Sequence, residues 1–147
     1  MNVHLQRVAP VDVDTYVELE KARAGLKTYH ALTDRAEALQ QIQDSVNYFI
    51  LSDATIVGSI SYKVRDGSSV EIDGVLIHPN YEGKGYAKAA LNLLLNELVS
   101  FENIFLMTHP MNPRSIHLYT GVGFTEAGIV ENYFGDGEHR LKFVLRR

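Results

Sequence analysis

The most informative segment of the chain reads Ile77-His78-Pro79-Asn80-Tyr81-Glu82-Gly83-Lys84-Gly85-Tyr86-Ala87. It predicts an apolar strand, a tight glycine turn and a long helix over residues 85–99. The first turn of a helix presents unpaired backbone N–H groups and the positive end of the helix dipole. Because Gly83 and Gly85 carry no Cβ, the backbone there can approach an anion closely. The segment therefore predicts a site for a phosphate or diphosphate.

Spacing separates the chemistries that use such a loop. A nucleoside-triphosphate loop requires Gly-x-x-x-x-Gly-Lys followed by Ser or Thr, but Lys84 is followed by Gly85. A dinucleotide fingerprint requires glycines at its first, third and sixth positions, but the sixth residue counted from Gly83 is Lys88. The first reading fails and the second has weak support, while a lone Gly-x-Gly turn can also be merely structural.

A third pattern, Gln/Arg-x-x-Gly-x-Gly/Ala after Val/Ile-x-Pro, belongs to the GNAT family of N-acetyltransferases. The chain resembles this pattern at all but one position, through residues 77–79 and 82–87. The resemblance implies that the loop binds the pyrophosphate of acetyl-coenzyme A (acetyl-CoA) and that the preceding strand lies along the same coenzyme. The coenzyme-binding residues implied in this region are Val75, Leu76, Ile77, Glu82, Gly83, Lys84, Gly85, Tyr86 and Ala87.

Glu82 is the position that departs from the pattern, since the family usually has Gln or Arg there. A carboxylate beside a diphosphate repels it unless the side chain turns outward and only its backbone N–H faces the ligand. We therefore expect Glu82 to affect the affinity for the coenzyme rather than its identity.

A second motif follows about thirty residues later, after a short apolar strand. It reads Asn112-Pro113-Arg114-Ser115-Ile116-His117-Leu118-Tyr119, then Gly121-Val122-Gly123-Phe124, and resembles the family's fourth helix. Asn before proline is also the usual N-cap of a helix. The resemblance adds that Asn112 and Ser115 contact the pantetheine arm or diphosphate, and both roles are compatible.

Composition fits one small enzyme domain over residues 1–147, with 46% hydrophobic and 22% charged residues. Cysteine is absent, which excludes disulfides and a cysteine nucleophile. The net charge of −4 is spread along the chain, which argues against a nucleic-acid surface and is compatible with a cationic acceptor. The six histidines have no metal-ligand spacing, so no metal is expected.

No apolar leader and no run of about 20 apolar residues is present, so we expect no membrane span and a cytoplasmic location by default. Hydrophobic periodicity predicts strands at 3–8, 48–52, 55–64, 70–77, 104–107, 125–133 and 140–145, and helices at 12–24, 33–45, 85–99 and 113–119, with Thr33 as a candidate N-cap. This order is that of the GNAT fold, an α/β (α+β) architecture with a mixed, mostly antiparallel central sheet flanked by helices.

The strand over 70–77 carries two candidate catalytic carboxylates. Period-two alternation places Glu71, Asp73, Val75 and Ile77 on one face. An amine with a pKa of about 10.4 is protonated at neutral pH, and removing its proton costs roughly 4 to 5 kcal/mol. Glu71 lies eleven residues before Glu82, a spacing that resembles the catalytic glutamate of the histone-acetylating branch. We take Glu71 as the first candidate base and Asp73 as the second, while two solvated residues without a catalytic role remain an alternative.

Tyr119 is the candidate general acid. A phenol with a pKa near 10 stays protonated at neutral pH and can donate a proton to a departing thiolate. Asn112, Ser115 and Tyr119 share one helical face. A tyrosine packed in the core is the alternative. The thioester carbonyl is expected to accept a hydrogen bond from a backbone N–H near Val75 or Leu76.

The resulting hypothesis is an acetyl-CoA-dependent N-acetyltransferase that transfers acetyl directly to a primary amine of a small molecule, peptide or protein in a ternary complex. The alternative is a non-catalytic acyl-CoA-binding or sensing module. The identity of the acceptor and a homodimeric assembly are both left open.

Overall fold

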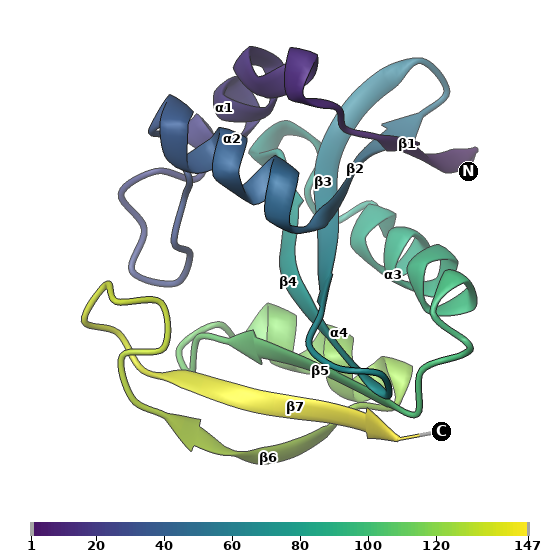
Figure 1. Cartoon of the computed structure of the whole chain (residues 1–147), viewed down its shortest axis with the longest axis vertical. Coiled ribbons are helices and arrows are strands. Elements are labelled where there is room, and N and C mark those ends of the chain that lie inside the picture. The colour runs from purple at the N-terminus through teal and green to yellow at the C-terminus, as the bar shows by residue number, and fades with distance from the viewer. Residues whose placement is uncertain (1, 147) are drawn as a thin grey trace.

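The computed structural model describes residues 2–146, which form one seven-stranded sheet flanked by helices (Figure 1). The strands are β1 (Val3–Arg7), β2 (Val46–Ser52), β3 (Thr55–Val64), β4 (Ser69–Ile77), β5 (Asn103–Thr108), β6 (Thr125–Val130) and β7 (Arg140–Arg146). The α-helices are α1 (Val13–Lys21), α2 (Arg35–Asp44), α3 (Tyr86–Glu97) and α4 (Pro113–Val122), and short 3-10 turns lie at Pro10–Asp12 and Pro79–Tyr81. The predicted fold class is confirmed.

The sheet has the order β1-β2-β3-β4-β5-β7-β6, and every neighbouring pair is antiparallel except β4 and β5. The parallel pairing joins only Ser69–Ile72 to Asn103–Leu106. Beyond Ile72, β4 continues without a partner on its β5 side, and the two ribbons diverge in Figure 1. The strand that leads to the glycine turn therefore has one edge along residues 73–77 that β5 does not pair with, where the carbonyl of Ile77 is engaged by Arg23.

A β-bulge changes the face that β4 presents. Asp73 is an extra residue, because the pairing with β3 shifts by one at this point. Ile72 and, beyond the bulge, Val75 and Ile77 all contact the core beneath α3. The prediction that Glu71, Asp73, Val75 and Ile77 share one face was therefore wrong: the two carboxylates line the other side.

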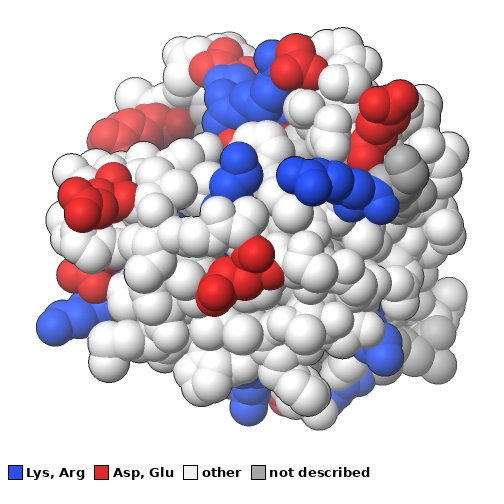
Figure 2. Space-filling view, turned by 90° about the horizontal axis from the view of Figure 1, so that it is seen from below, with Lys and Arg blue, Asp and Glu red and all other residues white. Residues whose placement is uncertain are grey.

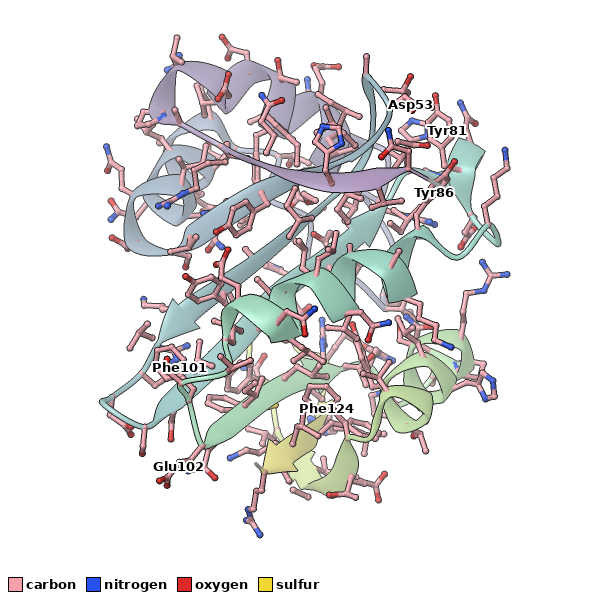
Figure 3. The ribbon with its side chains drawn as sticks, turned by 90° about the vertical axis from the view of Figure 1, so that its right-hand side faces the viewer. Asp53, Tyr81, Tyr86, Phe101, Glu102 and Phe124 are labelled. Atoms are coloured by element: carbon pink, nitrogen blue, oxygen red, sulfur yellow. The ribbon has the colours of Figure 1, made fainter. Side chains whose placement is uncertain are left out.

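Two hydrophobic cores lie on opposite sides of the sheet (Figure 1). One lies beneath α3, whose buried stripe is Ala90, Leu91, Leu94 and Leu95, continued by Leu98. The other lies beneath α1 and α2. Figure 3 shows α3 running across the sheet from Tyr86 at one end towards Phe101 and Glu102 at the other. These residues recur at helical spacing, so α3 buries one apolar face against the sheet.

Element boundaries differ from the predictions at a few ends. The N-cap of α2 is Asp34, which accepts a hydrogen bond from the backbone N–H of Glu37 at 3.0 Å, rather than Thr33. The strand predicted over 125–133 ends at Val130, where turns of the β6–β7 loop begin. No helix described between residues 2 and 146 is long and apolar enough to cross a membrane. In Figure 2 acidic and basic side chains are interspersed over the face shown.

Candidate active site

A cleft of about 1270 Å³ opens where β4 and β5 diverge. Its lining comes from α1, α2 and the segment between them, from β3, β4 and the end of β5, from the turn and first residues of α3, from α4, and from the β6–β7 loop with the first residue of β7. It brings together the predicted glycine turn, both predicted carboxylates and Tyr119. Residues that are distant in sequence therefore share one cavity.

The glycine turn has the conformation that its residues predicted. Gly83 and Gly85 have φ angles of +76° and +84°, in the left-handed region. Gly85 is the N-cap of α3 and offers no capping side chain, which leaves the N–H groups of the first turn free to face the cleft. A Cβ on Gly83 would meet no protein atom within 4 Å. Backbone conformation and access for a ligand, rather than packing within the protein, explain the glycine there.

Glu82 is engaged by two arginines. Its Oε1 lies 3.2 Å from Nη2 of Arg23 and 2.8 Å from Nη1 of Arg114. The turn that contains it lies between Tyr81 and Tyr86, whose rings contact edge to face at 6.5 Å (Figure 3). The charge that departs from the family pattern is thus compensated.

The start of α4 confirms the capping reading of Asn112. Its side chain accepts a hydrogen bond from the backbone N–H of Ser115 at 3.2 Å, and Pro113 follows as the first helical residue. Asn112 and Ser115 both line the cleft, so their predicted contact with a coenzyme stays a prediction.

Tyr119 lies at the base of the cleft and is only 6% exposed. Its ring packs against Phe124 and Phe143, with centroids 6.1 and 6.4 Å away. Burial raises the pKa of the Tyr119 phenol above its ordinary value, so the phenol stays protonated. Its hydroxyl has no hydrogen-bond partner within residues 2–146. Every fully buried polar side-chain atom of these residues does have a partner, so the hydroxyl of Tyr119 is not fully buried and opens into the cleft.

Glu71 is 1% exposed, and both of its oxygens are occupied. Oε1 accepts hydrogen bonds from Arg65, including one from Nε at 2.9 Å. Oε2 accepts one from the hydroxyl of Tyr133 at 2.8 Å, and burial, reinforced by Glu71, raises the pKa of Tyr133 to about 12. A guanidinium thus compensates the charge of Glu71.

Asp73 has neutral partners only. Oδ1 accepts a hydrogen bond from the hydroxyl of Ser61 at 2.6 Å. Oδ2 accepts hydrogen bonds from Ser45 at 2.8 Å and from the amide of Gln41 at 3.2 Å. No cation of the described chain forms an ion pair with Asp73. The carboxylate of Asp73 therefore has no compensating cation among the described residues, unlike that of Glu71.

Glu20 is a cleft residue that the sequence predictions missed. It is 1% exposed on α1 and accepts hydrogen bonds from the hydroxyl of Tyr29 at 2.7 Å and from the N–H of Leu32 at 3.2 Å. Burial raises the pKa of the Glu20 carboxyl to about 7, against the lowering effect of both hydrogen bonds. One signal was available: Val13, Val17 and Glu20 fall on the same helical stripe, where a carboxylate in the core is unusual.

The segment between α1 and α2 and the β6–β7 loop approach each other (Figure 1), and both contribute residues to the lining of the cleft. The ring of His30, between α1 and α2, stacks on Phe134 of the β6–β7 loop at 6.1 Å and lies 3.8 Å from Asp136. Aromatic side chains thus add to the carboxylates on this side. Across residues 2–146 no group of three or more metal-ligating side chains gathers.

The sheet diverges between β4 and β5, with the N-terminus of α3 at the opening, and this arrangement is that of the GNAT acyltransferase fold. The chain belongs to the acetyltransferase (GNAT) family, whose model matches residues 15–124. The resemblance predicted from the two motifs is confirmed.

Among curated proteins, spermidine N(1)-acetyltransferase of Vibrio cholerae is 33% identical over 70 residues, and the Escherichia coli K12 enzyme of that name is 29% identical over 70 residues. Each match covers 45% of this chain, but only 40% and 38% of these two relatives. The chain therefore aligns with about two fifths of the length of its curated relatives. Among solved structures, the ribosomal L7/L12 alpha-N-protein acetyltransferase RimL in complex with coenzyme A superposes with a TM-score of 0.83 at 15% identity, over 99% of this chain and 94% of that one. At that identity the match shows the fold.

Proposed function

We propose that the chain is an acetyl-CoA-dependent N-acetyltransferase that transfers acetyl directly to a primary amine in a ternary complex. One observation carries the proposal: the left-handed glycine turn at the start of α3, the carboxylates of β4 and the hydroxyl of Tyr119 all open into one cleft. Family membership supports the same activity.

The turn at residues 82–87 is proposed to hold the diphosphate of the coenzyme. Its free N–H groups and the dipole of α3 supply the binding energy. Val75, Leu76 and Ile77 lie on a strand edge that β5 does not pair with, along which the pantetheine arm can lie, and Asn112 and Ser115 line the same cleft. An N–H on this edge, near Val75 or Leu76, is proposed to donate to the thioester oxygen as negative charge develops there.

In the proposed reaction the amine nitrogen attacks the thioester carbon, and a C–N bond forms as the C–S bond breaks. The sulfur leaves as a thiolate, and Tyr119 donates its phenolic proton to it; the proton that the nitrogen loses as the amide forms then restores the phenol of Tyr119. This role requires a phenol that is protonated and reaches the cleft, which agrees with its burial and raised pKa.

The acceptor arrives as an ammonium ion and has to lose a proton. The geometry favours Asp73 over Glu71 as the base, because Arg65 already compensates Glu71 whereas Asp73 has only neutral partners. Glu71 is then the residue that holds Tyr133 in the wall of the cleft. Glu20, with its pKa near neutrality, is a third group able to take up a proton.

The acceptor is proposed to be a small cationic amine, with polyamines such as spermidine as the first compounds to test. Asp73 and Glu20, which have no cationic partner within residues 2–146, together with the nearby tyrosines, favour a ligand with more than one positive charge. The relatives named for spermidine support this choice. The cytoplasmic location, the homodimer and the absence of a nucleic-acid partner stay predictions.

The test is release of free coenzyme A thiol from acetyl-CoA in the presence of spermidine, single-charge amines, an amino acid and a peptide with a free N-terminus. We expect turnover with the di- and polyamines above the background rate. Tight binding of acetyl-CoA without turnover of any amine would favour the non-catalytic module. Absence of binding would overturn the proposal itself.

A further inference from the structure

Glu82 presents a problem at the glycine turn, because its carboxylate stands beside the place where the coenzyme diphosphate is proposed to bind. The guanidinium groups of Arg23 and Arg114, both near its Oε1, change the net charge at this place. Glu82 contributes −1, and Arg23 and Arg114 contribute +1 each, so the three side chains together carry +1. Glu82, Arg23 and Arg114 all line the same cleft as Gly83 and Gly85.

The two arginines are not equivalent. Arg23 is committed to the protein: its Nε and Nη2 donate to the carbonyl oxygen of Ile77 at 3.0 and 2.7 Å, and its side chain is only 20% exposed. Arg114 lies in the first turn of α4, its side chain is 67% exposed, and Glu82 is its one ion-pair partner within residues 2–146. The remaining donors of Arg114 are available to a ligand.

We infer that Arg114 is a binding residue for the coenzyme diphosphate, held ready by Glu82 in the free protein and shared with the phosphate when the coenzyme binds. The inference rests on the proposed function. A guanidinium has five donors in a planar fork that matches phosphate oxygens, so Arg114 can contact a phosphate through a second edge. Glu82 thereby holds Arg114 near the turn but also competes with the phosphate for its donors, and this competition outweighs the gain from holding it.

The experiment is calorimetric titration with three ligands: coenzyme A, dephospho-coenzyme A, which lacks the 3′-phosphate, and pantetheine, which lacks all phosphates. The variants are Arg114→Gln, Arg114→Lys, Glu82→Gln and the double variant Glu82→Gln/Arg114→Gln. Arg35→Gln is the matched control, because Arg35 is also exposed and also forms one ion pair, with Asp14 at 3.0 Å, but lies outside the cleft.

We expect Arg114→Gln to weaken coenzyme A and dephospho-coenzyme A by the same factor, about tenfold, with no change for pantetheine. Arg114→Lys should keep part of the affinity, since it keeps the charge and loses the fork. Glu82→Gln should tighten both phosphate ligands by about two- to fivefold, as expected for removing one partly exposed repulsive charge. Most of that gain should vanish in the double variant.

A loss confined to coenzyme A would place Arg114 at the 3′-phosphate and overturn the diphosphate assignment. An Arg114→Gln variant that binds both ligands as the unaltered protein does would overturn the inference altogether. Failure of the proposed function is a separate result: the unaltered protein itself would then bind no coenzyme A.

Discussion

The two sides of the cleft are built by different means. On the coenzyme side the groups proposed to bind are mainly backbone N–H groups, set by left-handed glycines, a helix start and the edge of β4 that β5 leaves open, with Arg114 as the charged side chain among them. On the acceptor side they are side chains, each held by partners from distant parts of the chain, as Glu71 is by Tyr133 at a separation of 62 residues. The coenzyme side is therefore formed mostly by residues close together in the sequence, whereas the acceptor side depends on residues that are far apart in it.

This difference suggests how the two sides respond to change. A backbone site depends on conformation, so it should tolerate most side-chain exchanges and fail when a glycine is replaced. A side-chain site depends on charge compensation. An isosteric exchange that removes a charge should therefore lower its activity, and the loss should depend on pH. The predictions below test the contrast with variants from each side.

The largest effect is expected on the acceptor side. Asp73→Asn removes the uncompensated carboxylate and should lower kcat/KM near pH 7 by about 100-fold, the lower end for general acid–base catalysis. Part of the rate should return at high pH, where more of the amine is already deprotonated. Glu71→Gln should have the smaller effect, because Arg65 compensates the charge it removes. A pH–rate profile unaltered by both exchanges would eliminate a dedicated base on β4.

On the coenzyme side, Gly85→Val should lower the affinity for acetyl-CoA by about 5- to 30-fold. A left-handed conformation costs a residue with a Cβ about 1–2 kcal/mol, and each 1.4 kcal/mol is a factor of ten in affinity. Gly67→Val is the control, since Gly67 lies outside the cleft, has no left-handed φ, and a Cβ there would meet no protein atom within 4 Å. Calorimetry that finds equal affinity for both variants would refute the loop assignment.

Tyr119→Phe joins the two sides, because it removes the proposed acid and leaves its ring packing in place. We expect kcat to fall about tenfold with acetyl-CoA affinity unchanged, since the hydrogen bond to the leaving thiolate forms in the transition state. Tyr48→Phe is the control, because it also removes one tyrosine hydroxyl, which donates to Glu97 at 2.7 Å, but at a place outside the cleft. Equal rates for the two variants would make Tyr119 a core residue only.

The same contrast explains what the sequence could predict. The glycine turn, the Asn112 cap and the order of strands and helices along the chain follow from local residue types and periodicity, and all three are present. The bulge at Asp73 could not be predicted, because an extra residue in one strand is defined only by its pairing with another. The partners of Glu20 and Glu71 come from loops whose path is set by tertiary packing, so neither network left a pattern in the chain.

The smallest expected effect concerns Glu20 and stability. Its pKa is raised to about 7 in the folded protein from an ordinary value of 4.5. Between these values the folded protein holds a proton that the unfolded chain has released, so stability from this group is complete below pH 4.5 and is lost as pH rises through 7. Relative to Glu20→Gln, the free energy of unfolding of the unaltered protein should fall by roughly 1 kcal/mol between pH 6 and pH 8.

Urea unfolding at a series of pH values measures this difference. The comparison uses the change with pH rather than the absolute offset, because the amide nitrogen of a glutamine replaces one carboxylate oxygen and so alters the hydrogen bonds with Tyr29 and Leu32 at every pH. Glu18→Gln on the same helix is the control, since the side chain of Glu18 is 72% exposed. Parallel curves for Glu20→Gln and the unaltered protein would mean that Glu20 ionises normally, and the acceptor side would then contain one fewer group able to take a proton from the amine.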